Sequence, residues 1–82
     1  MAVQSVNTTT AWVQVGTTVT RMLFEASGDH YVHLGSTAPA ATAPGFFAKS
    51  GEWMELLNID AYGGNVWVRS DVGAGAFTYA TA

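Results

Sequence analysis

Two histidines are the side chains of this sequence best suited to metal binding or acid–base chemistry. His30 and His33 are three positions apart. On a β-strand they therefore point to opposite faces and cannot share a metal ion unless a bulge intervenes. We interpret one as a turn residue and the other as part of a solvated face. Asp29 beside His30 resembles a fragment of an acid–base pair. The sequence contains no nucleophile-elbow motif, however, that would present a serine to such a pair.

The acidic residues do not form a convincing catalytic pair. Glycoside hydrolysis uses two carboxyl groups that flank a cleft, whereas Glu52 and Glu55 are three positions apart and point to opposite faces of a strand. Glu25 and Glu55 could approach each other across strands, although nothing in the sequence requires it. The glycine-rich segments 63–64 and 73–75 lack the lysine and the following helix of a phosphate-binding loop. We expect no enzymatic activity, no metal-binding residue and no cofactor.

Aromatic side chains suggest two kinds of binding surface. Flat rings could stack on a saccharide, which makes a carbohydrate-binding module one alternative; the candidate rings are Trp12, Tyr31, Trp53, Tyr62 and Trp67. Small β-sandwiches also use such rings to fill the core and to anchor protein interfaces. We favour interfaces, because interface use also explains the sparse charge described next.

The composition predicts that much of the surface is covered by other protein chains. Charged residues make up 11% of the 82 residues, against about 25% in an ordinary domain, and hydrophobic residues make up 49%. A domain of this size buries only about 60% of its unfolded surface. Without cysteine, it has no disulfide to compensate. We expect association with further copies; a Thr- and Ser-rich surface on a monomer is the alternative.

Charge and hydropathy exclude several kinds of partner. The net charge is −3 and the three basic residues, Arg21, Lys49 and Arg69, are too few for a nucleic-acid-binding patch. No apolar run approaches the roughly 20 residues of a membrane span. Residues 1–6 show neither the basic region nor the apolar core of a secretory signal. We therefore expect a chain made in the cytoplasm, without a nucleic-acid, membrane or small-molecule partner.

The segment 65–71 has the clearest strand pattern. It follows a Gly-Gly turn and alternates between one face with Val66 and Val68 and another with Trp67 and Arg69. Its expected partner is the segment 30–34. Residues 28–29 predict a tight hairpin into that partner.

The rest of the chain predicts further short strands and no helix. Expected strands cover residues 2–6, 10–15, 19–27, 45–48, 52–57 and 76–81. The stretch 35–44 contains two prolines and is expected to be an exposed crossover or contact loop. Of the adjacent Phe46 and Phe47, one should be core and the other exposed or at an interface. Residues 1–82 are thus expected to form one all-β domain, a jelly-roll or Greek-key sandwich of seven to eight strands. Residues 2–6 are expected to be an edge strand or, within residues 1–10, an N-terminal arm.

Three runs carry a family resemblance: Thr-Ala-Trp-Val-Gln-Val, then Gly-Asp-His-Tyr-Val-His-Leu-Gly-Ser-Thr-Ala-Pro, and then Asn-Val-Trp-Val-Arg-Ser. In this order they resemble short all-β virion structural proteins of tailed bacteriophages. These include capsid decoration (cement) proteins, which are often trimers seated on the outer shell. Tail, neck and baseplate components use similar sandwiches and stay open as alternatives.

The resemblance implies a decoration protein on the capsid surface of the virion. Its partners would be the major capsid protein and further copies of itself in a homotrimer. The N-terminal arm would add a strand to a neighbour's sheet edge, and the loop 35–44 would touch the capsid or an adjacent copy. The interface residues we expect are Val3, Val6, Trp12, Pro39, Pro44, Phe46, Phe47, Trp53 and Trp67.

Overall fold

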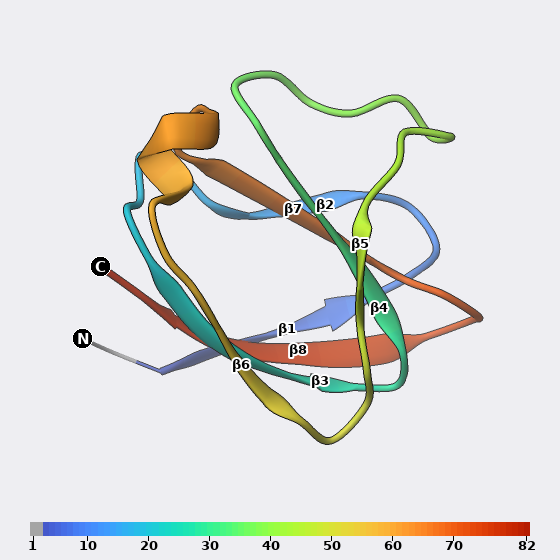
Figure 1. Ribbon diagram of the computed structural model, residues 1–82. Coiled ribbons are helices and arrows are strands. Elements are labelled where there is room, and N and C mark those ends of the chain that lie inside the picture. Colours follow the sequence, from blue (N-terminus) through green and yellow to red (C-terminus); the bar gives the residue numbers. More distant parts are fainter. Residues whose placement is uncertain (1–2) are drawn as a thin grey trace.

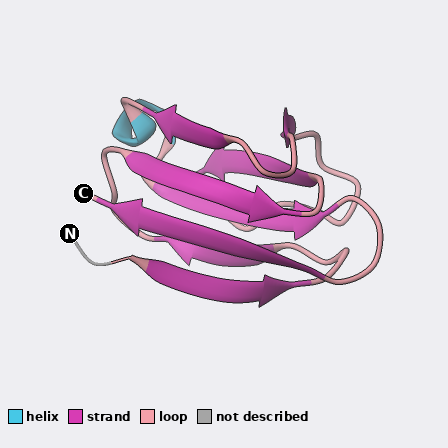
Figure 2. Cartoon of the chain, turned by 90° about the horizontal axis from the view of Figure 1, so that it is seen from below, coloured by secondary structure: helices cyan, strands magenta, loops and turns pink. Residues whose placement is uncertain are grey.

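The computed structural model describes residues 3–82 and shows two four-stranded antiparallel sheets packed face to face (Figures 1 and 2). Sheet A has the strand order β1-β8-β3-β6, and sheet B has the order β2-β7-β4-β5. The strands are β1 Gln4–Thr8, β2 Val13–Gly16, β3 Met22–Ser27, β4 His30–Gly35, β5 Phe46–Ala48, β6 Trp53–Leu56, β7 Asn65–Ser70 and β8 Gly75–Thr81. Because every connection except β4–β5 crosses between the sheets, this is a jelly roll, and the predicted all-β sandwich is confirmed.

Alternation along the strands produces the core. Phe24 and Phe77, on the neighbouring strands β3 and β8, stack with ring centroids 4.9 Å apart. Val66 and Val68 of β7 face them from sheet B and are fully buried. Each such side chain contributes about 1.5–3 kcal/mol on burial. The buried apolar cluster consists of Val15, Val19, Met22, Phe24, Ala26, Val32, Ala48, Ile59, Val66, Val68 and Phe77.

The pairing of β4 with β7 is confirmed, from His30 opposite Ser70 to Gly35 opposite Asn65. The hairpin predicted at residues 28–29 is wrong, because β3 and β4 lie in different sheets. Both strands turn their apolar side chains into the same interior. Gly28, with φ of 87°, lets the chain cross from one layer to the other.

A short 3₁₀ helix, η1 (Ile59–Tyr62), occupies the segment between β6 and β7. Ile59 is fully buried and anchors it to the core. Gly63 follows with φ of 106°, and a Cβ there would lie 2.5 Å from the backbone nitrogen of Ser36. Only glycine therefore allows η1 to pack so closely on the end of β4. Within residues 3–82, no helix is long and apolar enough to cross a membrane.

The N-terminal stretch forms an edge strand of its own domain. β1 pairs with β8 along its whole length, from Gln4 opposite Tyr79 to Thr8 opposite Gly75, and the half-buried Val6 packs against the core. Of the two alternatives for this stretch, the single chain shows the edge strand over residues 4–8 and not a projecting arm. Residues 1 and 2 of that stretch lie outside the described residues.

Candidate docking site

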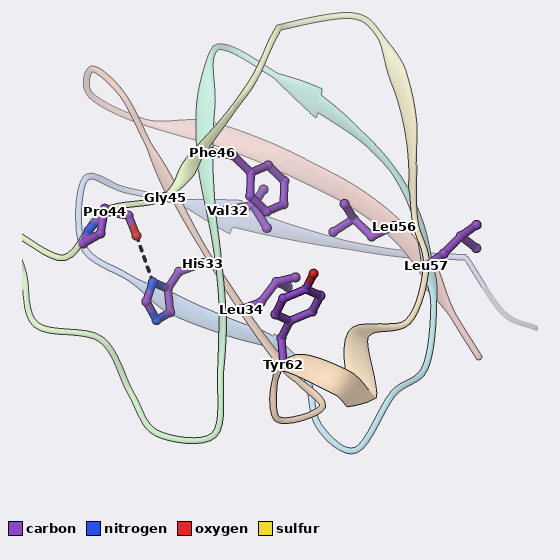
Figure 3. Close-up of a pocket in the computed structure, with 9 residues that line it drawn as sticks. All are labelled: Val32, His33, Leu34, Pro44, Gly45, Phe46, Leu56, Leu57 and Tyr62. Atoms are coloured by element: carbon purple, nitrogen blue, oxygen red, sulfur yellow. Dashed lines mark hydrogen bonds between the residues drawn. The ribbon is translucent and has the colours of Figure 1, made fainter.

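The sandwich is open along one side, where the edge strands of the two sheets diverge. β5 has only three residues and pairs with β4 over residues 30–32 alone, and β6 borders sheet A on the same side. Between them lies a groove of about 630 Å³ (Figure 3). We call it the docking groove; it is lined by Val32, His33, Leu34, Pro44, Gly45, Phe46, Leu56, Leu57 and Tyr62.

Apolar side chains dominate the docking groove. The rings of Phe46 and Tyr62 point toward the space between β4 and β6, with the Tyr62 hydroxyl directed into it (Figure 3). Val32 is fully buried and forms part of the floor. The His33 ring nitrogen Nδ1 lies 2.9 Å from the Pro44 carbonyl and donates to it. That donor is therefore already used within the chain.

Part of the apolar lining of the docking groove is exposed to solvent. Of the eight large apolar residues that the described chain exposes, three line the groove: Phe46 of β5, Leu57 after β6 and Tyr62 of η1. Leu57 and Tyr62 are 56% and 62% exposed. An exposed apolar lining of this kind on a small domain is typical of a protein interface.

Every charged residue between positions 50 and 68 is acidic. Glu52, Glu55 and Asp60 are all exposed and lie on or directly before β6 and η1. None of the three lines the docking groove: Glu55 stands opposite Leu23 on the outer face of sheet A, and Asp60 lies beside Thr18 and Thr20.

The outer face of sheet B carries an array of rings around one cation. The Arg69 guanidinium carbon lies 4.6 Å from the ring centroid of Tyr31 and 5.3 Å from that of Trp12. Its Nε is buried without a hydrogen-bond partner in the described residues. Trp12 donates its indole N–H to the Ala40 carbonyl at 3.0 Å. Together with the bond from His33 to Pro44, this fastens the loop between β4 and β5.

The structure corrects our interpretation of the two histidines, which we expected at a turn and on a solvated face, because His30 is in neither place. It is the first residue of β4, is 0% exposed, and links the two sheets. Nδ1 donates to the Gly28 carbonyl, and Nε2 accepts from the Thr8 hydroxyl, both at 2.6 Å. His33 lies on the opposite face of β4, as predicted. Within residues 3–82, no group of three His, Cys, Asp or Glu side chains could hold a metal ion.

The carboxylates of sheet A lie on its outer face and not in a cleft. Glu25 stands opposite Trp53, and Leu23 stands opposite Glu55. Glu25 and Glu55 therefore form a diagonal pair on one exposed face. Asp29 accepts the backbone N–H of Ser50 through its carboxylate at 3.0 Å, which is a turn contact.

The structure places the predicted interface residues on different parts of the molecule, some on its surface and some in its core. Val3 is exposed, Val6 packs against the core, and Pro39 is half-buried in the loop. Trp53 is exposed on sheet A. Trp67 is only 6% exposed although it faces outward on sheet B, where the ring of His33 packs against it.

Of the predicted set, only Pro44 and Phe46 line the docking groove. We expected one of Phe46 and Phe47 to be core, and this is wrong, because both are exposed. β5 borders the open side, so the inward direction at Phe46 leads into the groove. From the sequence we did not name Leu57, and we considered Tyr62 only as a ring for sugar stacking. Leu57 ends the expected strand 52–57, and no local signal shows that it meets Tyr62 at the groove.

The rings considered for sugar stacking are likewise divided. Trp12, Tyr31 and Trp67 lie on sheet B, Trp53 on sheet A and Tyr62 on η1. They do not form one platform.

Comparisons of this chain with protein-family models, with curated proteins and with solved structures found no match.

Proposed function

We propose that this chain is a non-enzymatic virion structural protein that decorates the outer surface of a tailed-phage capsid, binding the major capsid protein through the docking groove. The observation that carries the proposal is the apolar lining of that groove, in which Phe46, Leu57 and Tyr62 are exposed to solvent. The resemblance of the sequence to phage structural proteins supports the choice of partner. The groove contains one imidazole, that of His33, and its Nδ1 donates to the Pro44 carbonyl.

The proposed mechanism is additive burial. Each copy covers apolar surface of the shell with Phe46, Leu57 and Tyr62, and each Å² removed from water contributes about 25 cal/mol. Many copies bound at subunit junctions stabilise the shell, because disrupting it then requires breaking their contacts as well. Self-association as a trimer belongs to the same proposal, and Leu23 and Trp53 leave exposed apolar surface on sheet A for it.

Binding to capsid shells tests the proposal. Shells of the cognate major capsid protein, assembled without this chain, are sedimented with the wild type or with Phe46→Ser/Tyr62→Ser. We expect the wild type to pellet with shells and the double variant to stay in the supernatant. Val72→Ser is the matched control, since Val72 is 82% exposed on the β7–β8 turn, at the end of β7 away from η1, and should bind like the wild type.

Failure of the wild type to pellet with shells would overturn the capsid assignment. Binding to purified tails instead would identify a tail component. Circular dichroism of the double variant must match that of the wild type. If it does not, Tyr62→Ser alone replaces it, because Tyr62 is 62% exposed and its loss leaves the core intact.

A further inference from the structure

We infer that the free edge of β1 is a second interaction surface, at which two copies of this chain pair their β1 strands antiparallel across a twofold axis. The inference goes beyond the proposed function, because it involves neither the docking groove nor the capsid. Three features of the described residues carry it: an edge strand that nothing protects, backbone groups left free on that edge, and a register in which the strand pairs with itself.

Among residues 3–82, β1 lacks the features that protect the other three edge strands. Proteins prevent pairing at sheet edges with short strands, bulges, prolines and charged side chains. β5 has three residues and lies between Pro44 and Lys49. β2 has four residues and a register shift, and β6 carries Glu55. β1 contains neither charge nor proline nor glycine and keeps a continuous register with β8.

The hydrogen-bonding pattern of sheet A follows from the start of β3. The Arg21 N–H donates to the Ala82 carbonyl at 3.2 Å, and the Ala82 N–H donates to the Arg21 carbonyl at 3.0 Å. Hydrogen-bonded and non-bonded pairs alternate along an antiparallel ladder, and the register of β3 with β8 has no shift. Ala26, an odd number of residues after Arg21, therefore forms a non-bonded pair with Phe77. The backbone groups of Phe77 point toward β1.

Ser5 and Asn7 carry the free backbone groups of β1. Phe77 bonds to Val6, which stands opposite it, so the neighbours Ser5 and Asn7 direct their N–H and C=O groups away from β8. Both residues are exposed, and within residues 3–82 no strand pairs with this edge. These groups are therefore free to bond to a second chain.

A second copy of β1 supplies groups that match. In an antiparallel pairing centred on Val6, Ser5 of each copy stands opposite Asn7 of the other, and the two residues exchange both backbone bonds. Val6 then stands opposite Val6 in a non-bonded pair, where side chains approach most closely. Val6 packs against the core but is only half-buried, so this pairing would cover its exposed part.

Charge does not oppose this contact. The chain carries a net charge of −3, but neither β1 nor the adjacent strand β8 contains a charged residue. Like charges on two copies repel each other. A second copy can approach the edge of β1 without bringing such charges together there.

The contact differs from the trimer of the proposed function. β1 pairing uses the edge of sheet A, whereas the trimer would use Leu23 and Trp53 on the outer face of that sheet. A twofold contact joins two units and then closes. Monomers would therefore become dimers, and trimers would become hexamers. Halving of the native mass by variants of β1 reports this contact alone.

Sedimentation equilibrium over a range of protein concentrations tests the inference. Ser5→Lys/Asn7→Lys places Lys opposite Lys in the β1 pair and should weaken association about tenfold. Ser5→Lys/Asn7→Glu places Lys opposite Glu at the same positions and should associate at least as tightly as the wild type. Thr37→Lys/Thr42→Lys is the matched control, because it adds the same charge at exposed positions of the β4–β5 loop, and it should change nothing.

Hydrogen exchange of single amides gives a second readout. The N–H of Val6 bonds within the chain and should be protected at every concentration. The N–H groups of Ser5 and Asn7 should exchange more slowly as the protein concentration rises. If circular dichroism shows that Ser5→Lys/Asn7→Lys is unfolded, Ser5→Pro replaces it, because proline removes only an N–H that points to the free edge.

A wild type that stays monomeric or trimeric at every concentration would overturn the inference. Association that Ser5→Lys/Asn7→Lys leaves unchanged, or that Ser5→Lys/Asn7→Glu weakens equally, would also overturn it. Shell binding separates the two proposals. If shells are bound by a chain whose Ser5 and Asn7 amides exchange freely, the inference falls and the proposed function stands. If the β1 strands pair but shells are not bound, the proposed function falls and the inference stands.

Discussion

At the scale of single residues, the contact that ties the two sheets together at one end is polar. His30 is fully buried, and its two ring nitrogens bond to Gly28 of the crossover and to Thr8 of β1. Because a carbonyl can only accept, the neutral ring carries its proton on Nδ1 and accepts from the Thr8 hydroxyl at Nε2. The ring thus bridges sheet B to sheet A, with Gly75 packed against it.

Removing the Thr8 hydroxyl should lower the stability of the fold, because it leaves a buried ring nitrogen of His30 without a hydrogen-bond partner. Thr8→Val keeps the shape of the side chain but leaves Nε2 of His30 without its donor, so the free energy of unfolding should fall by about 1–3 kcal/mol. Urea denaturation measures the change. Thr10→Val, at an exposed position, is the control and should change stability little. A Thr8→Val variant as stable as the wild type would contradict the assigned bond.

At the scale of elements, two devices hold the open side of the sandwich. Arg69 stacks between Tyr31 and Trp12, and Trp12 fastens the β4–β5 loop through Ala40. The second device is the close packing of η1 on the end of β4, which requires glycine at position 63. Together they fix the two walls of the docking groove.

Two glycine substitutions separate strain from steric clash. Gly51 has φ of 81° with open space around it, whereas Gly63 has φ of 106° and backbone atoms of residues 35–36 within 3 Å of an added Cβ. Gly51→Ala should cost about 1–2 kcal/mol through left-handed strain alone. Gly63→Ala should cost a further 1–3 kcal/mol, approximately, through overpacking. Thermal unfolding measures both changes in stability. Equal losses of stability would contradict the account, because η1 could then shift away from β4 at no free-energy cost.

At the scale of the whole molecule, strand alternation predicted most of the fold. The inward set Met22, Phe24 and Ala26, and the pairing of β4 with β7, follow directly from alternating apolar residues. The crossover at Gly28 could not be predicted, because the same turn residues serve a hairpin and a change of sheet. Whether two successive strands pair in one sheet or lie in opposite sheets depends on how their apolar faces pack in the folded domain. The local sequence of the turn does not encode this.

The docking groove was harder to predict for a related reason. It forms where β5 is too short to continue along β4, and its walls come from segments far apart in the chain. Exposure of both Phe46 and Phe47 follows from this opening and not from their own alternation. The apolar side chains that the groove brings together, Leu57 and Tyr62 with Phe46, therefore meet only in the tertiary arrangement.

A reconstruction of decorated shells by electron cryomicroscopy tests the central claim, docking through the groove, most directly. We predict that Phe46 and Tyr62 face the shell, with a capsid segment in the groove beside the edge of β4. A bound copy whose groove opens to solvent, with a different face on the shell, would contradict the account.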